Sequence, residues 1–294
     1  MAHVTDEPLD AYVNRPLAEL VVKAVVDTAV TPNQLTFASL LLGTVAGVCI
    51  AVGLPVVGAL ALFFSMVLDC SDGQLARARG GGSVLGRIID GYADYWVALV
   101  VHVGILVQVF RAHVVVAGHA VGALESFVFV LAAGTSMGVH AGFFDYYKHR
   151  YLAHTGRGGP PEGPEMYLEE AERVRWSIVR AGLRLFALYV RTQQGPAFHA
   201  AAAEARVTAS DPIRVARFER ENGLLVRLHS ITGPTMHNAA IGVTCLVAPF
   251  VDHAFVWYCA FVIVAVNLYG LALHVVQRRV LARERARATV ASWA

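Results

Sequence analysis

Four aspartates at fixed intervals are the residues of this chain whose types and spacing suit chemistry best. They are Asp69, Asp72, Asp90 and Asp94, and they lie beside long apolar runs. On helices, spacings of three and four residues place both carboxylates of a pair on one face. Two helices joined by the glycine run at 80–82 would bring all four carboxylates together at the open end of a helical hairpin.

Four converged carboxylates repel one another unless a cation lies among them. Hard oxygen ligands in this number suit Mg²⁺ or Mn²⁺, and we expect two ions. Gly73, Ala76 and Gly86 are small enough to let a substrate approach the backbone closely. Arg77 and Arg79 are placed to neutralise phosphate charge.

The same stretch carries a resemblance to a known family. It fits the pattern D-x2-D-G-x2-A-R-x8-G-x3-D-x3-D at every fixed position, namely Asp69, Asp72, Gly73, Ala76, Arg77, Gly86, Asp90 and Asp94. The chain therefore resembles the CDP-alcohol phosphotransferases, or CDP-alcohol phosphatidyltransferases, which are integral membrane enzymes. The resemblance implies transfer of a substituted phosphate group from a CDP-linked donor to an alcohol hydroxyl, with release of CMP.

The resemblance also implies roles for single residues. The metal ligands would be Asp69, Asp72, Asp90 and Asp94, with Asp94 also the catalytic general base. The nucleotide-binding residues would be Asp69, Asp72, Gly73, Ala76, Arg77 and Gly86. For one glycine alone, helix packing in a membrane is the commoner explanation, so this expectation depends on the joint pattern.

The composition indicates a membrane protein, since 56% of the 294 residues are hydrophobic and 16% are charged, against about 25% charged in soluble domains. We expect an all-α polytopic bundle with an amphipathic juxtamembrane segment at 1–30 and a basic cytosolic tail at 278–294. Six transmembrane helices are expected, four of them in 31–151 and two in 231–277. Their approximate bounds are 34–53, 55 to the aspartate motif, 84–110, 120–146, 232–250 and 254–276.

Several local signals set element boundaries. Pro16 fits the first turn of an amphipathic helix, which we expect to lie on the membrane surface, with a helix that packs in a soluble part of the protein as the alternative. Thr31 followed by Pro32 reads as a helix start. In the cytosolic insertion at 152–230 we expect one helix over 165–192 and another from Asp211. This insertion would either cap the site or form a docking surface, and its arginines suit either a phosphorylated acceptor or a solvated helix face.

Six spans place both termini on one side of the membrane. The connections on the other side are 53–55, 111–119 and 250–254, and of the 24 Lys and Arg residues only Arg111 lies in them. By the positive-inside rule, both termini and the aspartates are then cytoplasmic. We expect a prokaryotic inner membrane protein, a homodimer as in many family members, with membrane lipid as a partner and no nucleic acid.

The alcohol and the lipid role stay open at this stage. The donor is either CDP-diacylglycerol, which we favour, or a CDP-linked small alcohol such as choline, ethanolamine or inositol that donates to a lipid hydroxyl. Asn33, His140, His237 and Asn238 are candidate substrate-binding residues, although lone polar residues in spans usually form interhelical hydrogen bonds. An ion-coupled transporter with intramembrane carboxylates is the alternative from another class, but it does not need the motif's small residues and arginine.

Overall fold

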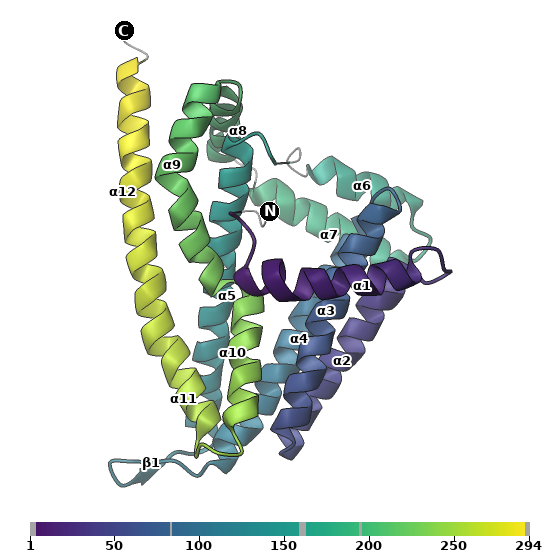
Figure 1. The fold of residues 1–294 in the computed structure, drawn as a ribbon, viewed down its shortest axis with the longest axis vertical. Helices are drawn as coiled ribbons and strands as arrows, with labels where there is room; N and C mark the ends of the chain where they lie inside the picture. The colour runs from purple at the N-terminus through teal and green to yellow at the C-terminus, as the bar shows by residue number, and fades with distance from the viewer. Residues whose placement is uncertain (1–3, 83, 159–162, 194–195, 292–294) are drawn as a thin grey trace.

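The computed structural model describes the chain except for residues 1–3, 83, 159–162, 194–195 and 292–294 (Figure 1). The described residues are almost entirely helical, with one short hairpin of β1 (Val115–Val116) and β2 (His119–Ala120). The expected all-α fold is confirmed.

The bundle is built from long helices that run between two ends of the molecule. They are α2 (Pro32–Val52), α3 (Pro55–Ala78), α4 (Val84–Arg111), α5 (Ala123–His154), α10 (Pro234–Val247), α11 (Ala254–Phe261) and α12 (Asn267–Ala291), the last two joined by a π-helical turn at Val262–Val266. The α2–α3 turn, the hairpin and the α10–α11 turn lie together at the bottom of Figure 1, away from the chain's C-terminus.

Five helices of the described chain are long and apolar enough to cross a membrane. They are Pro32–Val52, Pro55–Ala78, Leu85–Arg111, Ala123–His154 and Ala254–Glu284. The protein is thus an integral membrane protein. The remaining expected span, 232–250, contains α10, which packs on α3 and α5 but has 14 residues, fewer than the roughly 20 that cross a bilayer. A sixth crossing at α10 therefore stays a prediction.

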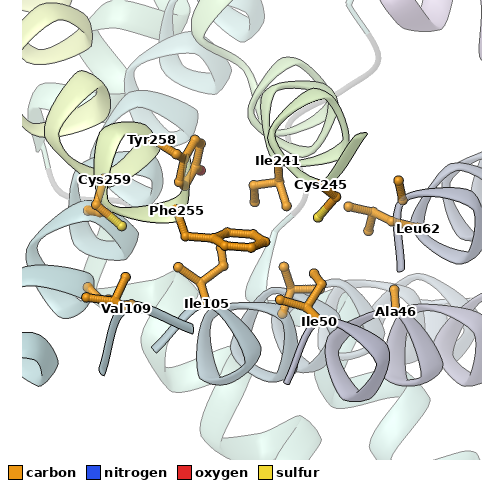
Figure 2. Packing of buried hydrophobic residues seen from close by; sticks show 14 of the residues in the cluster. Ala46, Ile50, Leu62, Ile105, Val109, Ile241, Cys245, Phe255, Tyr258 and Cys259 are labelled. Atoms are coloured by element: carbon orange, nitrogen blue, oxygen red, sulfur yellow. The ribbon is translucent and has the colours of Figure 1, made fainter. Parts of the chain in front are cut away.

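The core forms where α2, α3 and α4 meet α10 and α11. Ile50, Leu62, Ile105 and Ile241 are almost fully buried there, beside Phe255 (Figure 2). Small residues allow α2 and α4 to approach closely: a Cβ added at Gly104 would collide with the carbonyl of Gly47. Such contacts are typical of helices packed in a membrane.

The N-terminal segment lies across one end of this bundle. A π-helical turn at Asp10–Asn14 leads into α1 (Arg15–Val25), which crosses the direction of α3 in Figure 1 and packs on it. Ala18 and Val22 are buried, whereas Leu17 and Leu20 are exposed. An exposed apolar face on a helix that crosses the bundle fits a position on the membrane surface.

The start of α2 agrees with the sequence signal. The Thr31 hydroxyl accepts from the backbone N–H of Gln34, and the Gln34 side chain accepts from the backbone N–H of Thr31. The start of α9 (Pro212–His229) also agrees, because the Asp211 carboxylate accepts from the backbone N–H groups of Ile213 and Arg214. Both ends are fixed by side-chain caps.

The expected single helix over 165–192 is wrong. The insertion contains α6 (Pro164–Arg173), α7 (Ser177–Gln193), α8 (Pro196–Ala209) and α9 (Pro212–His229). The backbone is extended at Val174, whose carbonyl accepts from the Arg180 guanidinium. Helices α6 and α7 bury their apolar faces against each other, so one continuous stripe in the sequence became two facing stripes in the structure.

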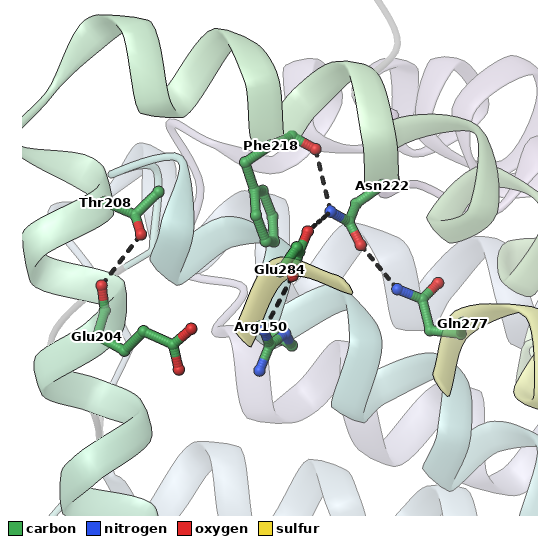
Figure 3. A network of polar contacts seen from close by, with 7 residues as sticks. All are labelled: Arg150, Glu204, Thr208, Phe218, Asn222, Gln277 and Glu284. Carbon is green, nitrogen blue, oxygen red and sulfur yellow. Dashed lines mark hydrogen bonds and ion pairs between the residues drawn. The ribbon is translucent and has the colours of Figure 1, made fainter. Parts of the chain in front are cut away.

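A buried polar network fastens α9 to the bundle helices. Asn222 of α9 donates to Glu284 of α12 at 2.6 Å, and its amide oxygen accepts from Gln277 at 2.7 Å (Figure 3). Glu284 also pairs with Arg150 of α5 at 3.5 Å. The last helix of the insertion thus packs on the C-terminal parts of α5 and α12.

Candidate active site

The hairpin of α3 and α4 brings three of the four aspartates together. Asp69, Asp72 and Asp90 each offer a carboxylate oxygen, and these oxygens lie within 4.8 Å of one another. The side chains of Asp69 and Asp90 are within hydrogen-bond distance of each other. Oδ1 of Asp90 is buried and has no hydrogen-bond donor among the described residues. A buried carboxylate oxygen without a donor, beside two further carboxylates, fits a divalent cation.

Helix α2 orients one of these ligands. The hydroxyl of Thr36 lies 2.5 Å from Oδ2 of Asp72, and both residues are buried. This bond holds the rotation of the Asp72 carboxylate within the cluster. The sequence carried no signal for Thr36, because the bond joins residues 36 positions apart.

Asp94 lies one turn after Asp90 on α4, outside the cluster of three. Together with Asp69 it lines a cavity of about 670 Å³ whose walls come from α2, α3, α4, α5, α10 and the N-terminal segment. Asp72 and Asp90 are not among the described lining residues. The cavity therefore opens on the Asp69 and Asp94 side of the cluster.

Gly73 of the motif does not contact a neighbouring helix as closely as the glycines of the core do. The three atoms nearest to a Cβ added at Gly73 all belong to the Arg77 guanidinium, the closest at 3.3 Å. No neighbouring helix comes as near, so interhelical packing does not account for Gly73 as it does for Gly104. Ala76 and Gly86 are partly exposed and Arg77 is exposed on the same end of the hairpin.

The expectation that Arg79 faces phosphate is wrong. Its guanidinium donates to the carbonyls of the α1–α2 connection, at 2.6 Å to Val30 and at 2.9 Å to Val26 and to Thr28. These bonds occupy the guanidinium and hold the end of α3 against the α1–α2 connection. Of the two arginines, only Arg77 is placed to face a substrate.

The four candidate substrate residues have different surroundings. Asn238 lines the cavity. His140 and His237 are buried against each other, with Nδ1 of His140 3.2 Å from Nε2 of His237, and neither is among the described lining residues. Asn33 is exposed in the first turn of α2. The geometry thus brings one of the four to the site.

The cavity has an apolar part and a polar end. Its apolar wall comes from α4 and α5 and includes Leu99, Val103, Leu106, Phe127 and Leu131. The polar end adds Glu7, Asp10, Thr235 and Asn238 to the two motif aspartates. Sequence reasoning missed Glu7 and Asp10, since nothing in their spacing connects them with the motif.

Comparison with known proteins assigns the helices that carry this site. Residues 29–151 match the family model of the CDP-alcohol phosphatidyltransferases. The matched region runs from just before the start of α2 to the last turn of α5 and includes all four aspartates. Residues 29–151 form a CDP-alcohol phosphatidyltransferase domain. The family consists of membrane-bound transferases of phospholipid biosynthesis that use a CDP-alcohol donor, an alcohol acceptor and divalent metal, as the sequence resemblance implied.

One curated relative of this domain is the "Bifunctional IPC transferase and DIPP synthase" of Thermococcus kodakarensis. It is 38% identical over 86 residues, which is 29% of this chain and 19% of the relative. The match thus covers about a fifth of that protein's length. Its name describes that protein only.

Proposed function

We propose that this protein transfers the phosphatidyl group of CDP-diacylglycerol to the hydroxyl of an alcohol and releases CMP. The observation that carries the proposal is the convergence of Asp69, Asp72 and Asp90, with Asp94 one turn away on the wall of a partly apolar cavity. The assignment of residues 29–151 to the family supports the general reaction. An ion-coupled transporter is disfavoured for the same reason.

Asp69, Asp72 and Asp90 would hold Mg²⁺ or Mn²⁺, and two ions fit a set completed by Asp94. Bound metal would neutralise the diphosphate charge and stabilise the leaving oxygen. Gly73, Ala76 and Gly86 would allow the cytidine nucleotide close to the backbone, and Arg77 would neutralise phosphate charge.

Asp94 would act as the general base. The acceptor oxygen forms a bond to the phosphorus remote from cytidine, the bond from that phosphorus to the oxygen of CMP breaks, and Asp94 takes the hydroxyl proton. The position of Asp94 on the cavity wall supports this role, because an acceptor in the cavity would reach it directly.

The apolar part of the cavity would hold a chain of the lipid. From Asp94 to Leu106 the wall follows 12 residues of α4, a length of about 18 Å. On α5, Gly138 lines the cavity, and a Cβ added there would meet no atom within 4 Å. An alkyl chain fits a long apolar space of this kind.

We further propose that the termini and the site face the cytoplasm of a prokaryotic cell, at the inner membrane. The basic C-terminal half of α12 and the charged insertion lie at the end of the bundle opposite the α2–α3 turn (Figure 1). The motif aspartates lie in the parts of α3 and α4 nearer this end, and the placement of basic residues there agrees with the positive-inside rule. We also propose that the protein is a homodimer, as many related enzymes are.

The experiment is donor discrimination with the purified full-length protein in detergent and Mn²⁺. One arm supplies CDP-diacylglycerol with small alcohols, and the other supplies CDP-choline or CDP-inositol with diacylglycerol. The proposal predicts CMP and a new phospholipid, identified by mass spectrometry, in the first arm, and neither with the Asp94→Asn variant. CMP in the second arm alone would make the lipid the acceptor, and CMP in neither arm would contradict the proposed reaction.

A further inference from the structure

The polar end of the cavity contains groups that the proposed reaction does not use. Glu7 and Asp10 come from the N-terminal segment, and Thr235 and Asn238 from the first turns of α10. They share the cavity with Asp69 and Asp94, the two motif aspartates that line it. A molecule that reaches the general base from this side must therefore lie against them.

These side chains are held in fixed positions. Glu7 is buried, and its Oε2 accepts from the backbone N–H of Met236 at 2.9 Å. Asp10 accepts from the Thr235 hydroxyl at 3.0 Å and from the fully buried Asn14 amide at 2.8 Å. Because a carboxylate has about four lone-pair positions, both groups can still accept further hydrogen bonds from a ligand.

The surroundings disfavour added negative charge. None of the described residues that line the cavity is Lys or Arg. Of the nearby cations, Arg15 pairs with Asp6 at 2.6 Å, and the Lys148 ammonium lies 5.4 Å from the centre of the Phe144 ring and only partly offsets the rise in the pKa of Glu7. Burial, with a smaller contribution from Asp10, raises the pKa of Glu7 to about 8.

The cavity also contains an acceptor that lacks a donor. Nδ1 of His102 lies 2.8 Å from the carbonyl oxygen of Ala98, so Nδ1 carries the proton and Nε2 accepts. Nε2 is buried, and no donor lies within reach of it among the described residues. His102 lines the same cavity two turns beyond Asp94, on the stretch of α4 beside the apolar wall, so it lies outside the polar end formed by Glu7, Asp10, Thr235 and Asn238.

The arginines of the insertion do not offset this charge. Arg184 pairs with Glu172 at 2.9 Å and Arg173 with Glu170 at 3.8 Å. Arg180 donates to the Val174 carbonyl within the α6–α7 turn. These three side chains stabilise the insertion itself and do not line the cavity.

We propose that the polar end of the cavity binds the acceptor alcohol and selects an acceptor without a phosphate group. This inference rests on the proposed function and names its acceptor class. An uncharged polyol or an amino alcohol would form hydrogen bonds with Glu7 and Asp10, whereas a phosphorylated alcohol would place its dianion against the Asp10 carboxylate, with no Lys or Arg among the described lining residues to offset it. Like charges brought together in this way exclude the wrong partner.

The test compares glycerol, inositol and serine, each against its phosphate monoester, with CDP-diacylglycerol and Mg²⁺. CMP release should favour the unphosphorylated member of a pair by about tenfold or more in kcat/KM, as expected for like-charge exclusion. Preference for the phosphorylated members would overturn the inference and leave the proposed function standing. Absence of CMP with every alcohol would overturn both.

Two variants connect the preference with the named residues. Asp10→Asn removes charge from the wall, and Asn238→Arg adds a cation while leaving both carboxylates in place, so one variant remains informative if the other fails to fold. Each should shift the ratio towards the phosphorylated acceptor by about tenfold if wall charge excludes the phosphate. The matched control is Glu19→Gln, which removes an exposed carboxylate of α1 paired with Lys23 and should leave the ratio unchanged. An unchanged ratio in both cavity variants would overturn the inference.

Discussion

At the scale of single residues, the site depends on groups that orient the carboxylates as well as on the carboxylates themselves. Thr36 fixes Asp72 from α2, and Asp10 is fixed by Thr235 of α10 and by Asn14. The spacing of the motif predicted that Asp69, Asp72 and Asp90 converge, because their positions follow from helix periodicity, whereas Asp94 lies outside this cluster. It could not predict Thr36, Glu7 or Asp10, because their contacts depend on how distant segments pack.

Thr36→Val tests the orienting hydrogen bond. Valine keeps the shape of threonine but cannot donate to Asp72, so metal affinity should fall about 10–100-fold, the usual effect of losing a group that orients a ligand. Calorimetric titration with Mn²⁺ measures this change. The control is Thr44→Val on the same helix, where the hydroxyl donates to the Leu40 carbonyl and accepts from Trp96; equal losses in both variants would contradict the role of Thr36.

Glu7→Gln tests the buried carboxyl group. Burial raises the pKa of Glu7 from its usual 4.5 to about 8, so between these pH values the folded protein binds more protons than the unfolded chain. The wild-type stability contributed by this group is therefore present below pH 4.5 and is lost as pH rises towards 8. Glutamine retains an acceptor for the Met236 N–H without titrating.

The difference in melting temperature between the Gln variant and wild type should therefore grow in favour of the variant as pH rises from about 4.5 to about 8. Thermal unfolding in detergent across this range measures the difference. A difference that does not change with pH would show that Glu7 is not held in its protonated form by the fold.

At the scale of elements, the long apolar helices follow the sequence closely, because hydrophobic length and caps define them. Thr31 and Asp211 cap the helices that begin after them, as predicted. The insertion was harder to predict, since a stripe of apolar residues does not reveal where a chain folds back on itself. The turn at Val174 is stabilised by Arg180, a contact that exists only after α6 and α7 have paired.

Arg79→Ala should lower the stability of the protein, whereas Arg77→Ala should weaken substrate binding. Arg79 donates to several carbonyls of the α1–α2 connection, so its loss should cost roughly 2 kcal/mol of stability, the scale of hydrogen bonds from a charged group. Arg77→Ala should leave the thermal midpoint unchanged and weaken CDP binding. A stable Arg79 variant with weakened CDP binding would reverse the assignment.

Gly138→Leu should block the apolar part of the cavity. The site of the new side chain is free of protein atoms within 4 Å, so the helix should persist while KM for the lipid donor rises roughly tenfold, because each displaced CH₂ forfeits about 0.8 kcal/mol. Gly142→Leu, one turn along α5 and equally free of neighbours, lies outside the described lining and serves as control. Equal KM values for the two variants would place the lipid chain elsewhere.

At the scale of the whole molecule, the fold brings segments from both sides of residues 29–151 to the motif. The N-terminal segment and α10 supply the polar end of a cavity whose catalytic side comes from α3 and α4. The family domain at 29–151 contains the aspartates but not Glu7, Asp10, Thr235 or Asn238. We therefore expect the nucleotide half of the reaction to depend on the domain and acceptor choice to depend on the segments around it.

The central claim is that the aspartate cluster is a metal-dependent phosphotransferase site. It is tested most directly by measuring CMP release from CDP-diacylglycerol by metal-stripped protein before and after addition of Mg²⁺ or Mn²⁺, with the accepted alcohol present. The account predicts no CMP before addition, turnover after it, and a loss of about a hundredfold or more in Asp69→Ala, Asp72→Ala, Asp90→Ala and Asp94→Asn, as expected for removal of a metal ligand or base. Full turnover in excess EDTA, or full turnover in any of these four variants, would contradict it.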